Sequence, residues 1–165
     1  MKKPAAGKKS AKELWGEEQF ILADRYMEQR KFKKAFQILL TTVDSGSMVC
    51  FMGLGYYYDV GLGCKRDRQK ALYWYKRAVR RGSSSAAINI GITYRNQRKR
   101  YLALYWFKKS LAMGDGDALL ELGKLMLNAY GDKTQAKHYF RATIKRKTCI
   151  TEFSQEEAAE YLAKL

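Results

Sequence analysis

The chain has 165 residues and a formal net charge of +16, from 32 basic and 16 acidic residues. This length favours one domain, and an apolar fraction of 47% is enough for a continuous core. No stretch approaches the ~20 apolar residues that a membrane-spanning helix needs. The start of the chain has no apolar secretory segment, so we expect a cytoplasmic protein without membrane insertion. The three cysteines, Cys50, Cys64 and Cys149, argue against a disulfide framework, because their number is odd.

Apolar residues recur at helical spacing along the chain, and the alternation typical of strands is nowhere sustained. After a basic, flexible tail at 1–12, we expect four helical hairpins in an array over 13–153. The predicted helices lie near 15–29 and 32–44, 48–59 and 67–81, 84–95 and 99–112, and 116–129 and 132–146, in units near 14–47, 48–83, 84–115 and 116–148. Ser154 and the acidic residues after it predict a capping helix over 154–165.

A repeat runs through these hairpins. Its second helices each open on an alanine, at Ala35, Ala71, Ala103 and Ala136, with spacings of 36, 32 and 33 residues. A bulky pair follows three residues later, at Ile38-Leu39, Trp74-Tyr75, Trp106-Phe107 and Tyr139-Phe140. We assign the aromatic pairs to the core. A period of this length with two helices per unit is typical of an α-solenoid.

Glycine recurs inside the predicted first helices, at Gly55, Gly91 and Gly123. Glycine in a helix interior costs about 1 kcal/mol relative to alanine. Its recurrence therefore indicates that a neighbouring helix packs closely against the bare backbone at these positions.

The second unit resembles a Sel-one-like repeat, a relative of the tetratricopeptide repeat. The matching residues are Leu54, Gly55, Tyr58, Gly61, Gly63, Asp67, Lys70, Ala71, Trp74, Tyr75, Ala78 and Gly82, with departures at Cys50 and Cys64. The third unit keeps the pattern but lacks the Gly-x-Gly loop, and the fourth keeps its helical positions. The resemblance covers roughly residues 17–147 and implies an all-α, right-handed α-solenoid of about four hairpins with a C-terminal capping helix.

We find no pattern for catalysis, a metal or a cofactor. His138 is the only histidine, and general acid–base catalysis needs a positioned partner. A metal site would need further ligands with characteristic spacing. Gly61-Leu62-Gly63 joins two helices rather than the strand and helix of a dinucleotide-binding turn. We predict a protein that is not an enzyme.

The first helices of such solenoids line the concave side, and we place the partner-binding surface there. Counted from the recurring glycine, positions −2, +1, +2 and +5 should face away from the second helix. The predicted partner-binding residues are Tyr56, Tyr57, Asn89, Thr93, Asn96, Lys124 and Asn128. Basic residues cluster instead on the second helices and their turns, where we expect a positive convex face. They are Arg66, Arg68, Lys76, Arg77, Arg80, Arg81, Arg98, Lys99, Arg100, Lys108 and Lys109.

Two functions stay open from the sequence. The resemblance implies a protein–protein interaction scaffold or adaptor, or in bacteria a neutralising, immunity-type partner of a toxin. The positive charge points to an acidic protein or peptide as the partner. The alternative is nucleic-acid binding through the basic convex face. The oligomeric state is not determined by the sequence.

Overall fold

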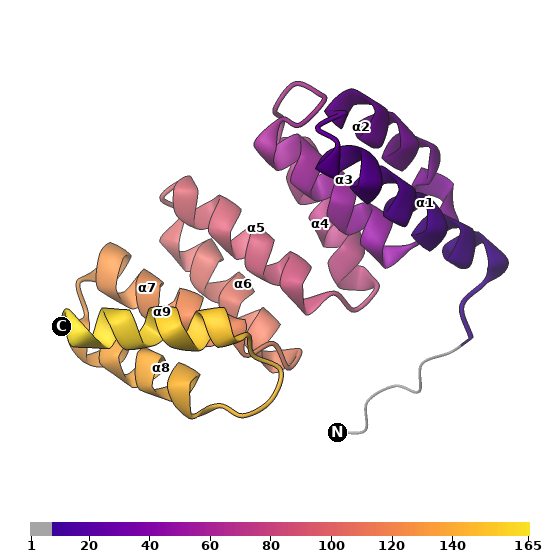
Figure 1. The fold of residues 1–165 in the computed structure, drawn as a ribbon. Helices are drawn as coiled ribbons and strands as arrows, with labels where there is room; N and C mark the ends of the chain where they lie inside the picture. Colours follow the sequence, from indigo (N-terminus) through magenta and orange to yellow (C-terminus); the bar gives the residue numbers. More distant parts are fainter. Residues whose placement is uncertain (1–7) are drawn as a thin grey trace. The chain divides into compact units, whose positions relative to one another are not determined.

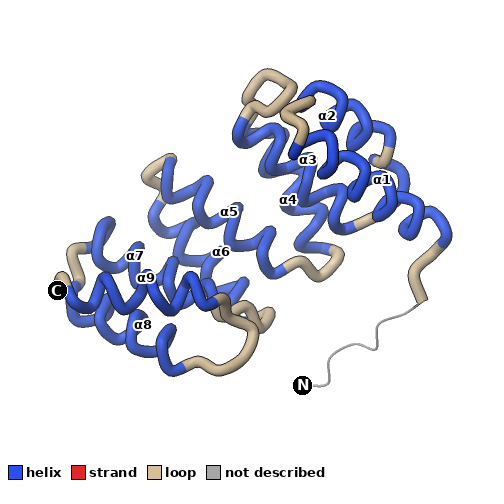
Figure 2. Tube along the Cα trace, viewed as in Figure 1, coloured by secondary structure: helices blue, strands red, loops and turns tan. Residues whose placement is uncertain are grey.

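A computed structural model describes residues 8–165, and all regular structure within this range is helical (Figures 1 and 2). The helices are α1 (Ala11–Glu28), α2 (Phe32–Thr41), α3 (Met48–Val60), α4 (Arg68–Arg80), α5 (Ser84–Asn96), α6 (Arg100–Ala112), α7 (Asp117–Leu125), α8 (Lys133–Lys145) and α9 (Glu152–Ala163). A 3₁₀ turn, η1 (Val43–Ser45), follows α2, and a π-helical segment, η2 (Met126–Tyr130), extends α7. The predicted helices are confirmed within a few residues. The fold is all-α and of the α-solenoid class.

The chain divides into two compact units, unit 1 (Met1–Ala78) and unit 2 (Val79–Leu165). The described part of unit 1 contains α1, α2, α3 and most of α4. Within it, α1 packs against α2 and α3. In unit 2, successive helices from α5 to α9 pack against one another, and α7 also contacts α5 and α9.

One contact recurs in the hairpins of α3–α4, α5–α6 and α7–α8. A side chain added to the glycine of the first helix would bring its Cβ to within 3.0 Å of three ring carbons on the second helix. The pairs are Gly55 with Tyr75, Gly91 with Phe107, and Gly123 with Phe140. The predicted close approach is confirmed, because each aromatic ring lies directly on a backbone that has no side chain.

The aromatic pairs differ from the prediction. Their second members are fully buried, with Tyr75 only 1% exposed and Phe107 0% exposed. Trp74 is also buried, but Trp106 is half-buried, so its assignment to the core is wrong. Neighbouring residues on a helix point about 100° apart, and only one of them can face the glycine. Trp106 instead contacts Tyr105 edge-on and lies under the ammonium group of Lys109, 4.8 Å from its ring centroid.

The helix starts explain most element boundaries. The carboxylate of Asp67 accepts hydrogen bonds from the backbone N–H groups of Gln69 and Lys70, both at 3.0 Å, at the start of α4. Asp132 similarly caps α8 by accepting from Gln135 N at 2.9 Å. These are the capping groups that a helix N-terminus prefers.

Both ends of the described chain depart from the predicted boundaries. Residues 1–7 of the predicted tail lie outside the described range, and α1 already begins at Ala11, after a capping box of Ser10 and Glu13. The last helix begins two residues before the predicted start. Its cap is Thr151, whose hydroxyl accepts from Ser154 N at 3.2 Å, so the prediction of Ser154 as the cap is wrong. Thr151 takes this place because its own N–H and hydroxyl donate to the Asp117 carboxylate on α7.

Helix α9 lies against α7 and α8 (Figure 1). Ala158 is fully buried, and the ring of Tyr161 stacks on Phe140 with 4.9 Å between the ring centroids. The helix thereby covers apolar surface at the C-terminal side of unit 2, as a capping element in a repeat array does.

Gly91→Ala tests the helix contact. Propensity alone would make alanine stabilising by about 1 kcal/mol, but overpacking against Phe107 should destabilise the fold by about 1–3 kcal/mol. Urea unfolding measures the difference. Asn89→Ala, on the same helix but half-buried, is the control and should change stability little. A Gly91→Ala variant more stable than the unmodified chain would contradict the close approach.

Phe107→Ala and Trp106→Ala test the corrected core assignment. Truncating the buried phenylalanine should cost about 3–5 kcal/mol. Truncating the half-buried tryptophan should cost clearly less, since part of its surface already contacts solvent. Equal losses in thermal or urea unfolding would restore the original assignment of both rings to the core.

Candidate partner-binding site

Two of the predicted partner-binding residues are buried, and for these the prediction is wrong. Tyr57 is 4% exposed and Thr93 is 2% exposed. The +2 position faces the preceding hairpin in unit 1, where Tyr57 stacks on Phe36 of α2 with 6.1 Å between centroids. Burial, aided by the charge of Asp24, raises the pKa of Tyr57 to about 12. Neither side chain can meet a partner without local unfolding.

Lys124 is occupied within an ion-pair cluster. Its ammonium group lies 3.2 Å from Glu121 Oε1 on α7 and 2.7 Å from Glu157 Oε1 on α9, and its side chain is 15% exposed. Glu121 also accepts from Arg95 Nη1 of α5. Burial lowers the pKa of Lys124, but the hydrogen bonds and charges of Glu157 and Glu121 outweigh it, so the net pKa lies above the ordinary lysine value. The cluster joins three helices of unit 2 and leaves Lys124 little capacity for a partner.

The other predicted residues remain accessible. Tyr56 is 45% exposed in unit 1. In unit 2, Asn89 is half-buried, while Asn96 and Asn128 are exposed. Asn128 also lines a pocket of about 390 Å³, whose walls are Arg95, Arg98, Arg100, Leu125, Asn128 and Ala129. We call this the arginine pocket. No carboxylate is among its lining residues.

The arginine pocket is formed where α5 turns into α6 and where α7 ends. Arg98 occupies the turn with a left-handed backbone, at φ 59°. Arg100 opens α6, and its Nη1 donates to Ala129 O at 3.0 Å in η2. Segment η2 is π-helical, and π-helical turns within α-helices are frequent at functional sites. Three arginines thus line one pocket from two helices and one turn. Arg95 is paired with Glu121, and Arg100 donates to the Ala129 carbonyl. The Arg98 guanidinium is suited to a carboxylate or phosphate.

The predicted basic residues are divided between the two units. Arg66, Arg68, Lys76 and Arg77 belong to unit 1, and the others belong to unit 2. Most are exposed, but Arg77 lies over the rings of Phe51 and Trp74, at 4.3 and 5.1 Å from their centroids. The second helices α2, α4, α6 and α8 contain no aspartate or glutamate. Each of these helices therefore carries only basic charge.

The sequence analysis missed two features of basic surface. Arg95 was not predicted, although it lies three residues before Arg98 and so one helical turn away from the pocket turn. An open hollow of about 490 Å³ in unit 1 was also missed. Its lining consists of Arg30, Lys31, Phe32, Lys33, Lys34 and Gly63. The shared Gln-Arg-Lys sequence at residues 29–31 and 97–99 would have indicated both turns.

The predicted lack of a metal site concerns the only histidine of the sequence and the acidic and cysteine side chains. His138 is exposed on α8. Among residues 8–165, no three His, Cys, Asp or Glu side chains are placed to hold a metal ion together. Within the same range, no helix combines the length and apolar character that crossing a membrane requires.

Comparison with known proteins places the hairpins in a family. The family model for the Sel1 repeat matches residues 50–83 and 85–115, which contain α3 with α4 and α5 with α6. The chain contains two Sel1 repeats. The recurring Gly55–Tyr75 and Gly91–Phe107 contacts lie inside them. Sel1 repeat proteins generally mediate protein–protein interaction and are typically non-catalytic scaffolds.

Solved structures share this fold. A Sel1 repeat protein from Oxalobacter formigenes is 21% identical, with a TM-score of 0.62 over 85% of this chain and 56% of that one. A protective antigen present in uropathogenic Escherichia coli strains, displaying an SLR fold, is 19% identical, with a TM-score of 0.71 over 91% of this chain and 34% of that one. The chain thus spans little more than half, and about a third, of these two structures.

A third structure, of an immunity protein from Pseudomonas aeruginosa, is 15% identical, with a TM-score of 0.39 over 87% of this chain and 81% of that one. A score at this level carries no argument about a shared fold or partner. No curated protein is significantly similar to the sequence.

Lys124→Ala tests the ion-pair cluster beside the Sel1 repeats. Removal of the ammonium group leaves Glu121 and Glu157 facing each other in a partly buried place and should cost about 2 kcal/mol. Lys164→Ala is the control, because the Lys164–Glu160 pair is largely exposed, and it should change stability by less than about 0.5 kcal/mol. Equal losses of stability for Lys124→Ala and Lys164→Ala in urea unfolding would show that the cluster does not stabilise the fold.

The same cluster predicts a pH dependence. Because the folded-state pKa of Lys124 is raised, its contribution is complete below the unfolded lysine pKa of about 10.4 and is lost as the pH rises through the folded value. The stability difference between Lys124→Ala and the unmodified chain should therefore be constant near neutral pH and shrink above pH ~10.4.

Proposed function

We propose that the chain is a non-catalytic interaction module that binds an acidic protein partner, and that in unit 2 the partner places a carboxylate in the arginine pocket. The observation that carries the proposal is the convergence of Arg95, Arg98 and Arg100 on one pocket without a lining carboxylate. An arginine fork binds a carboxylate through two parallel hydrogen bonds. Arg95 already binds the Glu121 carboxylate through one such hydrogen bond, from its Nη1.

The rest of the surface suits the same partner class. Asn128 in the pocket and Asn96 nearby on α5 offer amide donors and acceptors. The basic charge of the second helices would accelerate the encounter with an acidic surface, and salt would weaken this effect. The proposal covers adaptors and neutralising, immunity-type partners alike, because both act by occupying a protein surface without chemistry.

The second candidate function, nucleic-acid binding, has a specific observation in its favour. In unit 2, α6 presents Tyr101 and Tyr105 at 78% and 57% exposure, beside the exposed Lys108. Exposed aromatic rings interleaved with cations can stack on bases along a phosphate backbone. The pocket favours the acidic partner, because it adds converging guanidinium groups that stacking on α6 does not need.

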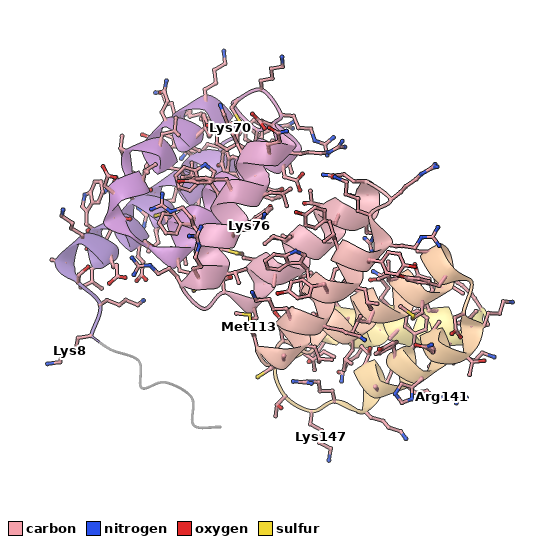
Figure 3. All side chains as sticks on the ribbon, turned by 180° about the vertical axis from the view of Figure 1, so that it is seen from behind. Lys8, Lys70, Lys76, Met113, Arg141 and Lys147 are labelled. Atoms are coloured by element: carbon pink, nitrogen blue, oxygen red, sulfur yellow. The ribbon has the colours of Figure 1, made fainter. Side chains whose placement is uncertain are left out.

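Charge reversal at Arg98 tests the proposal. A fluorescein-labelled ten-residue glutamate peptide serves as the probe, and its anisotropy reports binding at low salt. Arg98→Glu should weaken binding by at least about fivefold, since it replaces a favourable exposed ion pair by a repulsion. Lys147→Glu is the matched control. Lys147 belongs to the same unit and extends outward from the loop after α8 (Figure 3), so its reversal should change affinity by no more than about twofold.

Three outcomes would count against the proposal. Equal losses for Arg98→Glu and Lys147→Glu would show attraction by net charge alone, without a pocket. Absence of peptide binding at low salt would also overturn it. Tighter binding of a ten-residue uridylate, lost on Tyr105→Ala but not on Arg98→Glu, would favour nucleic-acid binding through α6.

A further inference from the structure

We propose that unit 1 has a second site for a carboxylate of an acidic protein segment, at the hollow lined by residues 30–34 and Gly63. The inference rests on the proposed function for the acidic nature of the ligand. It goes beyond that function because it assigns a second binding site, whose basic residues lie outside the two matched repeats. We call this site the unit 1 hollow.

The turn at the unit 1 hollow has the same backbone as the turn at the arginine pocket. Arg30 and Arg98 are both left-handed, at φ 57° and 59°. Arg30 N donates to Met27 O at 2.8 Å, and Arg98 N donates to Arg95 O at 2.8 Å. The side chains of the two arginines therefore extend from equivalent positions in two turns that have the same backbone conformation.

The lysine after each arginine repeats the match. Lys31 N donates to Tyr26 O at 2.8 Å, and Lys99 N donates to Tyr94 O at 2.9 Å. Their ammonium groups also lie over the same tyrosines, 5.9 and 6.0 Å from the ring centroids. Sequence and geometry thus agree over the whole Gln-Arg-Lys turn in both units.

Folding alone does not require arginine in such a turn. The turn between α7 and α8 places Gly131 in the left-handed conformation, at φ 69°, and then Asp132 as the helix cap. Left-handed backbone is uncommon for residues other than glycine, asparagine and aspartate. The chain nevertheless has arginine at both 30 and 98, and each of these residues lines one of the two hollows.

The unit 1 hollow is built to receive an anion with an apolar stem. Arg30, Lys31, Lys33 and Lys34 line the hollow together with Phe32, and no carboxylate lines it. The ammonium groups of Lys31 and Lys34 lie over the ring of Tyr26. The loop at Gly63 also lines the hollow. A Cβ added to Gly63 would lie 2.8 Å from Lys33 N and closer still to the Phe32 carbonyl. The loop is thereby fixed against α2. Aspartate or glutamate within a peptide has the matching combination of a charged end and an apolar stem.

The turn arginines also lack competing ligands. Within residues 8–165, neither the Arg30 nor the Arg98 guanidinium has a side-chain hydrogen bond or ion pair of its own. Both are exposed. A partner carboxylate would meet them without displacing an existing pair.

Arg30→Gly and Arg98→Gly separate binding from folding. Glycine adopts positive φ freely, so each variant should keep or raise the melting temperature while losing a guanidinium. A four-residue glutamate peptide blocked at both ends is titrated into ¹⁵N-labelled protein and followed by NMR. In the unmodified chain, amide shifts should move around 30–34 and 63 and, separately, around 95–100 and 128.

The variants predict a distinct pattern at each site. Arg30→Gly should weaken peptide binding at the unit 1 hollow by at least fivefold and leave the arginine pocket unchanged, and Arg98→Gly should do the reverse. Lys12→Ala and Lys147→Ala are the matched controls for the loss of one positive charge in each unit and should leave both sites within twofold.

The outcomes distinguish this inference from the proposed function. Shifts at the arginine pocket alone would overturn the unit 1 hollow and leave the proposed function standing. Shifts at the unit 1 hollow alone would support the inference and overturn the pocket as the partner site. No shifts at either site would overturn both. A blocked four-residue uridylate that saturates the unit 1 hollow at a lower concentration than the peptide would overturn its assignment to a carboxylate.

Discussion

The close approach of an aromatic ring to a bare glycine backbone is the contact on which the hairpins depend. It occurs at Gly55, Gly91 and Gly123, each time with a fully buried or almost fully buried ring. A ring can lie on the helix only where no Cβ intervenes, so the glycine fixes both the spacing and the rotation of the second helix. Close packing of this kind leaves little tolerance for added volume. The second helix therefore has one defined inner face, and everything else on it is directed outward.

This fixed rotation explains the distribution of charge. Alanine and large apolar side chains take most of the inner faces of α2, α4, α6 and α8, together with the buried hydroxyls of Ser110 and Thr143. The charged residues of these helices are exposed or half-buried and are all basic. The acidic residues of the helices lie on first helices and on α9, where Glu121 and Glu157 are neutralised by Arg95 and Lys124. The second helices are positive because basic residues outnumber acidic ones two to one in the chain and none of the acidic residues lies on these helices.

Much of the fold was predictable because its signals are local or periodic. The caps at Asp67 and Asp132 and the recurring glycines act over a few residues, and apolar spacing determines the helices. The error at Trp106 arose within its own helix, whereas other errors concern side chains whose surroundings are set by another helix or hairpin. Tyr57 was predicted to face a partner because only its own second helix was considered, whereas Phe36 of the preceding hairpin covers it. The arginine pocket was missed for a similar reason. Its lining includes Asn128 and Ala129 of η2, which belong to the next hairpin, and Arg100 at the start of α6 donates to Ala129 O. No local sequence signal specifies that contact.

The departures from the repeat pattern coincide with the candidate site. The third unit keeps the glycine, alanine and aromatic positions that build the hairpin, but it lacks the Gly-x-Gly loop of the second unit. In its place is a short turn in which Arg98 adopts the left-handed backbone conformation, which glycine adopts more easily than arginine. Packing constrains the helical positions of a repeat far more than its turns, which contact few neighbours. Arg98 is exposed, so the core does not require it, and it lines a pocket that has no carboxylate among its lining residues. The proposed binding site is placed at this turn for that reason.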